Sequence, residues 1–554
     1  TIALALEAAP VQERSLEALA YHWWAAGAEA EAARYNEEAG DAAARLHAHE
    51  DAIALYQRVL ELSDVDPMQR GSVLEKVSDA HLALARSEEA LASFGAAADV
   101  FREAGAHDFE ARCRVRAAVA AYALALPEPT QQLKDMLGRL DRSEFSARSR
   151  LHIGLAWLAA SFWFPTEAER HLAQVDSRAL LAAPDIELRF HNISAWTAMT
   201  LGDLPRFRRE HAAWIEAARI TGSAASLAAA HFNGAVCLSI FSLHSEALQN
   251  IEQALRIARE ARNRHAEESA QALSASCYFL MGDLARARKA VEAVPATTEN
   301  KVNIAYVSAW GTLVGLHLDD DNLIARCFDR FEDVVSASPE IETAAAFAEV
   351  MVRRGRHADA AAFVQRAIPD RELLRGNSLS LLAAGRYGAS ADRTRARTYL
   401  VRAAAGPIEM LERPALALFD AEAAVREGRP AAAKALASQA AAGFRRLRMP
   451  LLEAAALEVA GNIAGALTLF RQCGAAYDVG RLERATSSHR PRFGEAVDAQ
   501  RELSAREREI AQLAKAGRSN REIASQLYIA QKTVEKHLAS AFQKLGISSR
   551  SQLV

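Results

Sequence analysis

The chain has 554 residues, of which 51% are hydrophobic and 25% charged, and its formal net charge is −4. This composition is ordinary for a soluble globular protein, and the length predicts about three or four domains. Because no apolar run is long enough for a transmembrane helix and the N-terminus lacks the basic start of a signal peptide, the sequence predicts a cytoplasmic protein with no membrane partner.

The N-terminal segment holds two groups of residues whose chemistry suggests a site. One group is aromatic and consists of Tyr21, Trp23 and Trp24. These residues could form either an aromatic ligand-binding site or a packing contact between repeats. We favour packing, because aromatic residues at repeat interfaces normally belong to the hydrophobic core. The other group carries metal-ligating atoms and consists of His47, His49 and Glu50. Its spacing does not fit one helical face and no further ligand is near, so we predict a junction between two helices.

From about Ser15 to Glu483 the sequence is rich in alanine and leucine and has helical periodicity throughout. One segment fits the tetratricopeptide pattern of two packed helices, with Leu74, Val77 and Ser78 on the first and Ala90, Phe94 and Ala97 on the second. Small residues there let the helices approach, and the aromatic residue fills the gap between them. The positions that we predict to be equivalent to Ala90, each in the second helix of a pair and here called marks, are Ala52, Ala90, Ala168, Phe207, Ala247, Ala287, Ala325, Ala360, Ala396, Ala433 and Ala466.

From Ala168 onward these marks are 33–40 residues apart. Turn signals precede many of them, at Gly202-Asp203, Gly282-Asp283, Asp319 to Asn322, Gly355, Gly385 and Gly428. The gap from Ala90 to Ala168 is double, which indicates a degenerate pair near Leu133. We therefore predict an all-α protein in which residues 1–483 form a tetratricopeptide-like solenoid of about twelve helix pairs with a concave binding surface.

Two further features of the array are interpreted structurally. The run from Asp319 to Asn322 suggests calcium, but it lacks the spaced oxygens and the Glu of a calcium loop, so an N-cap is the favoured interpretation. The five cysteines are far apart and lack C-x-x-C spacing. Cys113, Cys237, Cys277, Cys327 and Cys473 are thus predicted to be small buried residues in a reducing cytoplasm rather than disulfides or metal ligands.

Residues 484–500 are predicted to be a linker, because Pro491 and Gly494 interrupt the helical pattern. Three short helices are predicted within residues 501–554. Two capping boxes open the first two helices, Ser504 with Glu507 and Ser519 with Glu522, and Gly517 is placed to end the first. A turn at Tyr528 to Ala530 precedes a longer helix from near Gln531 to Gly546. This order is the helix-turn-helix pattern.

The longer helix has two faces. Its apolar face holds Val534, Leu538, Phe542 and Leu545, and we expect it to pack on Ile510, Leu513 and Ile523. Lys532, Thr533, Glu535, Lys536 and Ala539 fall mostly on the opposite side, the side that enters a major groove. Ten Lys/Arg and five Asp/Glu give residues 501–554 a net charge of +5, so the first 500 residues carry −9. A basic tip on an acidic body favours DNA as a partner.

Catalytic signatures are absent from the sequence. It contains no P-loop and no G-x-S-x-G, H-E-x-x-H or G-x-G-x-x-G motif. We therefore predict a protein that is not an enzyme and that binds no cofactor in this chain. A receiver or acyl-homoserine-lactone sensor is disfavoured, because both need strand-helix alternation.

The C-terminal segment resembles the effector domain of LuxR-type bacterial regulators. The matching residues are L-S-x-R-E-x-E from Leu503, Gly517, S-N-x-E-I-A from Ser519, K-T-V from Lys532, His537, and K-L-G with a later S-R between Lys544 and Arg550. The resemblance implies that Glu535, Lys536 and Ala539 face base edges and that Thr533, Lys544 and Arg550 lie near phosphates. Arg518 and Lys532 are expected to add phosphate affinity, and His537 completes the predicted DNA-binding set.

Two departures from the family pattern affect this segment. Ala530 stands where the family usually has Ser, which removes a side-chain N-cap worth roughly 1 kcal/mol. The family's fourth helix, often its dimer contact, would follow Val554.

The array ahead of this module is similar to the C-terminal half of the large ATP-binding, MalT-like LuxR regulators, and residues 19–62 resemble the stretch that follows their ATPase part. Because Thr1 is not a Met, we expect a preceding nucleotide-binding domain outside this chain, to which any ATP would belong.

The resemblance implies a bacterial transcriptional regulator. Its helix-turn-helix reads double-stranded promoter DNA, and its array senses an unknown small-molecule or protein effector and controls self-association on DNA, with RNA polymerase as a possible further partner. The alternative is a protein-interaction scaffold whose DNA module only localises it.

Overall fold

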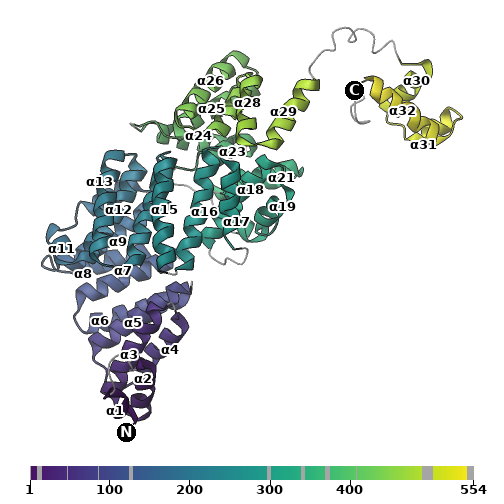
Figure 1. Cartoon of the computed structure of the whole chain (residues 1–554). Helices are drawn as coiled ribbons and strands as arrows, with labels where there is room; N and C mark the ends of the chain where they lie inside the picture. Colours follow the sequence, from purple (N-terminus) through teal and green to yellow (C-terminus); the bar gives the residue numbers. More distant parts are fainter. Residues whose placement is uncertain are drawn as a thin grey trace. The chain divides into compact units, whose positions relative to one another are not determined.

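The computed structural model describes residues 2–8, 15–46, 48–84, 86–123, 129–261, 263–295, 301–337, 343–368, 375–406, 408–488 and 503–545 (Figure 1). Within these ranges every regular element is a helix, which confirms the all-α prediction. None of these helices is long and apolar enough to cross a membrane. The chain divides into two compact units, Thr1–Tyr477 and Asp478–Val554, which are described separately below.

The first unit, here called the array, contains most of the helices. Its first half comprises α1 (Ile2–Glu7), α2 (Leu16–Ala25), α3 (Glu29–Arg45), α4 (His49–Glu61), α5 (Pro67–Ala83), α6 (Ser87–Glu103), α7 (His107–Ala123), α8 (Pro129–Arg139), α9 (Phe145–Ser161), α10 (Pro165–Leu172), α11 (Ser177–Ala182), α12 (Pro184–Leu201), α13 (Leu204–Ile220), α14 (Ala224–Ile240) and α15 (His244–Glu260).

The second half comprises α16 (Arg264–Leu280), α17 (Leu284–Ala293), α18 (Lys301–Leu318), α19 (Asp321–Ile324), the π-helical turn η2 (Ala325–Asp329), α20 (Glu332–Ala337), α21 (Ala344–Arg353), α22 (His357–Ala367), α23 (Ser378–Tyr387), α24 (Ser390–Ala404), α25 (Glu412–Arg426), α26 (Pro430–Arg446), α27 (Pro450–Val459) and α28 (Ile463–Cys473). The boundary between the two units falls inside α29 (Ala476–Ser488).

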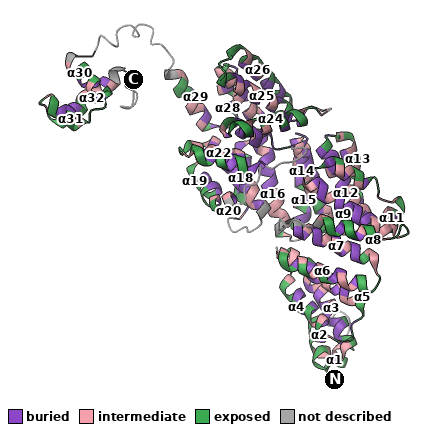
Figure 2. Ribbon diagram, turned by 180° about the vertical axis from the view of Figure 1, so that it is seen from behind, coloured by how far each residue is buried: buried purple, intermediate pink, exposed green. Residues whose placement is uncertain are grey.

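The helices of the array are stacked as pairs. The two helices of a pair pack on each other, as α5 does on α6, α14 on α15 and α25 on α26. The first helices of successive pairs also pack on one another without a break, in the order α7, α9, α12, α14, α16, α18, α21, α23, α25 and α27. Figure 2 shows the buried residues where these helices face each other. The described residues therefore form the predicted solenoid, and the degenerate pair is α7 with α8, where Leu133 is buried.

The recurring small residue occupies one position in most pairs. In nine of the eleven predicted repeats the predicted residue is the fourth of the second helix and is buried; it is alanine in eight of them, as at Ala52, Ala90 and Ala247, and Phe207 in the ninth. Ala396 is buried too, but it is the seventh residue of α24. Ala325 was assigned wrongly, because α19 begins at Asp321 and Ile324 fills the buried fourth position, which leaves Ala325 exposed.

One predicted turn signal was also wrong. Gly385 lies inside α23 rather than in a turn, and a Cβ there would come within 2.4 Å of the Phe419 ring on α25. The glycine is needed for close packing of two first helices, and the turn follows at Gly388.

Ion pairs connect successive repeats at nearly the same spacing. Lys76 pairs with Glu37, Arg112 with Glu75, Arg206 with Glu169, Arg386 with Glu422 and Arg446 with Glu409, and the members of each pair are 36–39 residues apart. Because one repeat is about this long, each pair joins equivalent places in neighbouring repeats.

The small predicted sites of the array have structural roles. His49 begins α4 and Glu50 pairs with Arg86, in agreement with a helix junction, while His47 lies outside the described residues. Asp320 caps α19 by accepting a hydrogen bond from the Leu323 N–H at 3.1 Å, which confirms the cap. All five cysteines are buried free thiols. Burial raises the pKa of the Cys277 thiol to about 11.

The aromatic group near the N-terminus is not the core that we predicted. Tyr21 is 54% exposed and Trp24 is 40% exposed, whereas Trp23 is partly buried and packs against a core cluster that includes Leu19, Tyr35 and Tyr56. Helix α2 buries Leu19 and Ala20, which leaves Tyr21 and Trp24 on its outer side. The guanidinium of Arg58 lies 5.6 Å from the Trp24 ring.

Two contacts join parts of the array that are about 170 residues apart in sequence. Arg375 donates from Nε to the Thr200 carbonyl at 2.8 Å and from Nη1 to the Ala403 carbonyl at 2.9 Å, and its side chain is buried. The Leu411 N–H donates to Ser242 Oγ at 3.1 Å. The residue pairs show that the segment just before α23 lies against the last turn of α12, and that the segment just before α25 lies against the turn after α14.

We predict that acid destabilises the array through buried histidines. Burial first, and then the charges of His171 and Arg148, lower the pKa of His152 from 6.5 to about 4. As pH falls below 6.5, the unfolded chain takes up a proton that the folded chain refuses, so stability is complete above pH 6.5 and is lost toward pH 4. The free energy of unfolding in urea should fall by about 1.4 kcal/mol per pH unit through this group.

His152→Gln should remove this part of the slope, whereas His357→Gln, at an exposed site on α22, serves as the matched control. An unchanged slope in His152→Gln between pH 7 and pH 5 would contradict the assignment.

Candidate nucleic-acid interface

The second unit contains a three-helix module: α30 (Ala505–Lys515), α31 (Asn520–Gln526) and α32 (Gln531–Leu545). Ile510, Ala514, Ile523, Ala524, Val534 and Leu538 form its buried core, with Leu513, Leu527, Ile529 and Phe542 packed against it. The predicted apolar face of the last helix therefore packs as expected, except that the Leu545 side chain lies outside the described residues.

Both predicted capping boxes are present. Glu507 Oε2 accepts from the Ser504 N–H at 2.8 Å, and Ser504 Oγ accepts from the Glu507 N–H at 3.2 Å. The equivalent bonds between Ser519 and Glu522 measure 2.7 and 3.3 Å. Gly517 has a φ of +83°, the left-handed conformation in which it ends α30 without strain.

Glu507 makes a further contact that sequence patterns did not reveal. Ser540 Oγ, on α32, donates to Glu507 Oε1 at 2.7 Å, and Glu507 is buried. The same carboxylate thus caps α30 and holds α32 against it. Arg506 adds a second tie, because its Nη2 donates to the Leu527 carbonyl at the end of α31 at 2.9 Å. These contacts fix the orientation of the three helices relative to one another within the module.

The outer side of α32 carries most of the predicted DNA-binding residues. Lys532, Glu535, Lys536 and Ala539 are exposed and follow each other at helical spacing, so the fold brings them to one face. Thr533 and His537 are partly buried at the edges of this face. Gln531 Nε2 donates to Glu535 Oε1 at 3.3 Å, which orients that carboxylate along the helix.

The remaining predicted residues lie elsewhere. Arg518 is exposed in the turn between α30 and α31 rather than on α32. Lys544 belongs to α32, but its side chain lies outside the described residues, as does all of Arg550.

Two further exposed side chains of the module were not predicted. Arg521 is exposed at the start of α31, the helix that crosses the DNA backbone in helix-turn-helix proteins. Tyr528 is 96% exposed and has a φ of +54°, a conformation that costs a non-glycine residue roughly 1–2 kcal/mol. A count of basic residues in the short helix would have found Arg521, whereas nothing in the sequence indicates the backbone angle of Tyr528.

The same segment matches known proteins. The family model described as "Bacterial regulatory proteins, luxR family" matches residues 501–554. Spore germination protein GerE of Bacillus subtilis (strain 168) is 48% identical over 52 residues, which are 9% of this chain and 70% of GerE. The chain belongs to the luxR family of bacterial regulatory proteins. The LuxR-type module is thus a DNA-binding helix-turn-helix domain, which supports a role as a transcriptional regulator.

The likeness of other proteins to this LuxR-family chain is more limited. An HTH-type transcriptional regulator of Mycobacterium bovis is 42% identical over 52 residues, and the chain spans only 6% of that relative's length. Among solved structures, the apo form of RapI is similar to 60% of this chain and 96% of its own, with 10% identity and a TM-score of 0.38. The repeat character of the array therefore rests on the helix contacts described above.

The double role of Glu507 leads to a prediction for the LuxR-type module. Glu507→Ala removes a cap and a charged hydrogen bond between helices, so we expect the module to lose about 2–3 kcal/mol. Glu522→Ala removes the same kind of cap at an exposed site and should cost about 1 kcal/mol or less. Hydrogen exchange of peptides from α30 and α32 in the full chain measures both losses, and equal losses would exclude the contact with Ser540.

Proposed function

We propose that this chain regulates transcription by placing α32 in the major groove of promoter DNA, and that the array receives the controlling signal. The observation that carries the proposal is the exposed face of Lys532, Glu535, Lys536 and Ala539 on the last helix of a LuxR-type domain. In helix-turn-helix proteins, residues near the N-terminus of that helix contact base edges. The net charge of +5 on residues 501–554 supplies attraction to phosphates.

Individual residues divide between affinity and sequence reading. Lys536 has the donors to bind guanine O6 and N7, and Glu535 has the acceptors for cytosine N4. Arg518, Lys532, Thr533, Lys544 and Arg550 are proposed to contact phosphates, and Arg521 joins this group because it is exposed on α31. Ala539 offers an apolar contact, and His537 lies at the edge of the same face.

The array and the module divide the work of regulation in this proposal. The net charge of −9 on the first 500 residues disfavours DNA as a partner of the array, whereas its stacked helix pairs offer an extended inner surface for an effector. An effector that changes self-association of the array would pair two modules on two half-sites, which raises affinity without any new base contact.

Binding of the full chain to DNA separates the two classes of lysine. On a fragment that the chain selects from a random library, Lys536→Ala should lose roughly 1–3 kcal/mol and relax the sequence preference. Lys544→Ala should weaken selected and random DNA alike, and should lower the salt slope by about one.

Lys434→Ala, at an exposed site on α26 in the array, is the control for loss of a positive charge alone. Equal losses on selected and random DNA for Lys536→Ala would exclude base reading by this residue, and no binding by the wild-type chain would overturn the proposed function.

A further inference from the structure

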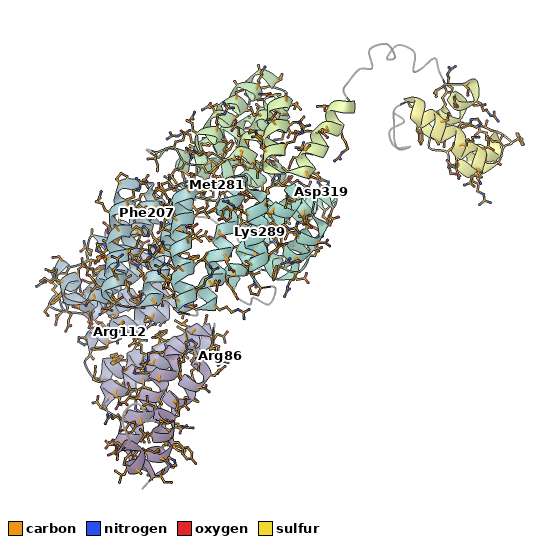
Figure 3. The ribbon with its side chains drawn as sticks, in the orientation of Figure 1. Arg86, Arg112, Phe207, Met281, Lys289 and Asp319 are labelled. Atoms are coloured by element: carbon orange, nitrogen blue, oxygen red, sulfur yellow. The ribbon has the colours of Figure 1, made fainter. Side chains whose placement is uncertain are left out.

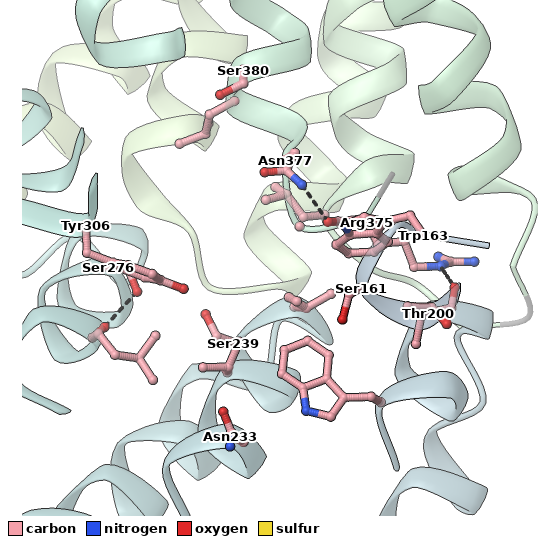
Figure 4. Close-up of a pocket in the computed structure, with 18 of the residues that line it drawn as sticks. Ser161, Trp163, Thr200, Asn233, Ser239, Ser276, Tyr306, Arg375, Asn377 and Ser380 are labelled. Carbon is pink, nitrogen blue, oxygen red and sulfur yellow. Dashed lines mark hydrogen bonds between the residues drawn. The ribbon is translucent and has the colours of Figure 1, made fainter. Parts of the chain in front are cut away.

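The inner layer of the array contains two adjoining, partly open cavities. The larger has a volume of about 440 Å³ and is lined mainly by the first helices α9, α12, α14, α16 and α18 and by the start of α23 (Figure 4). The smaller, of about 140 Å³, lies among α7, α9 and α12. Trp157, Asn192 and Ile193 line both. Together they reach the size typical of small-molecule sites.

Three arginines line the smaller cavity, and no carboxylate does. They are Arg112, Arg150 and Arg189, of which Arg112 is labelled in Figure 3. Arg150 is fully engaged, because it donates to Asp108 at 2.8 Å and to Asp185 at 2.5 Å.

Arg112 is only half engaged. Its Nη2 donates to Glu75 Oε2 at 2.5 Å, but its buried Nε has no partner among the described residues. Glu75 is shared with Arg116, which also pairs with Asp79. The carboxylates beside this cavity are therefore already bound to other guanidinium groups.

Arg189 is the unusual member of the set. Within the described residues it makes no hydrogen bond and no ion pair, although it is partly buried in α12. Burial and the charges of Arg116 and Arg150 lower its pKa to about 10, against the opposing pull of Asp185 and Glu75. A guanidinium has five N–H donors, and leaving them unpaired away from water is costly.

The sequence spacing of the ion pairs explains why Arg189 has no acidic partner in a neighbouring repeat. The ion pairs that Arg150 makes between neighbouring repeats join residues 35–42 positions apart, to Asp185 and to Asp108. At those distances from Arg189 lie residues 147–154 and 224–231, and neither stretch contains Asp or Glu. The chain therefore places a cation at this position and supplies no acid from either neighbouring repeat.

The larger cavity has different chemistry. Its walls include Trp157, Trp163, Trp196, Tyr306 and Trp310, and its hydroxyl and amide groups come from side chains such as Ser161, Asn233 and Ser380. Its one lining cation, Arg375, points its guanidinium at the Thr200 and Ala403 carbonyls rather than into the space (Figure 4). No carboxylate lines this cavity either. An uncharged ring system fits these walls.

We propose that the two cavities form one binding site for a small organic anion. Its carboxylate or phosphate lies between Arg189 and the free Nε of Arg112, and its ring body stacks on the tryptophans of the larger cavity. Asn192 Oδ1, buried without a hydrogen-bond partner at the junction, accepts an N–H or O–H of the ligand. This inference names a ligand class for the sensing role that was proposed above for the array, and it rests on that proposed function.

Closure of the array connects this site to the rest of the molecule. The cavity walls belong both to α12 and α14 and to the segment from Arg375 to Leu411, which the contacts with Thr200 and Ser242 hold together. A ligand that touches both sides strengthens this closure.

Four probes with the same naphthalene ring test the charge requirement: 2-naphthoate, 2-naphthyl phosphate, 2-naphthamide and 2-naphthamidine. Calorimetric titration of the full chain should show at least one of the two anions binding about tenfold or more tightly than the neutral amide, with the cationic amidine weakest. The tighter anion identifies the head group. Equal binding of all four probes, or preference for the amide, would overturn the proposal.

Arg189→Met tests the assigned residue without loss of a hydrogen bond or ion pair to the described residues. It should abolish the preference for anions, keep the affinity for 2-naphthamide, and leave the thermal midpoint equal or higher. Arg366→Met, at an exposed site on α22 outside both cavities, should change nothing. Trp196→Leu should weaken all four probes alike. An anion preference that survives in Arg189→Met would refute the assignment.

DNA binding by the same variants separates this inference from the proposed function. Without a ligand, Arg189→Met should bind DNA as the wild type does. Lost anion preference with intact DNA binding counts against the site alone, whereas wild-type protein that fails to bind DNA counts against the function alone.

Discussion

The close approach of two helices at one small residue sets the geometry of the whole array. Where Ala52, Ala90 or Ala247 occupies the fourth position of a second helix, the side chain is buried and its partner helix comes near. This contact recurs once in each repeat, and ion pairs between neighbouring repeats, such as Arg112 with Glu75 and Arg386 with Glu422, have the corresponding spacing of 36–39 residues. The same repetition aligns the first helices into one inner layer, whose side chains are then free to specialise.

Local patterns predicted local structure well. The capping boxes of Ser504 and Ser519 and the left-handed Gly517 need only residues three or four apart, so the sequence contains all the information about them. The prediction for Ala325 was wrong for a related reason. A shift of one residue at the start of α19 moves a different side chain, that of Ile324, into the buried position. Gly385 has the composition of a turn but the environment of a core helix, and only the position of Phe419 reveals the difference.

Contacts between distant segments could not be predicted in the same way. Ser540 reaches Glu507 because α30 and α32 cross, and Arg375 reaches Thr200 because the array closes over about 170 residues. The exposed face of α32 was predictable, since amphipathic spacing alone separates Lys532 and Lys536 from Val534 and Leu538. Which base or phosphate each of these residues contacts is a property of the complex with DNA, and it stays a prediction here.

Arg189 shows how a regular architecture makes an irregular residue informative. In a repeat array, the partner of a charged side chain is expected one repeat away, and most arginines near the smaller cavity satisfy this rule. A cation that breaks the rule lowers the stability of the empty protein, because burial of an unpaired charge is unfavourable. Its replacement by Met is thus expected not to destabilise the array, and a partly buried cation that the fold does not pair, beside an aromatic cavity, is better explained by a ligand than by the fold. The regular spacing of ion pairs in the array therefore also identifies Arg189 as an exception, and we interpret this exception as a binding residue.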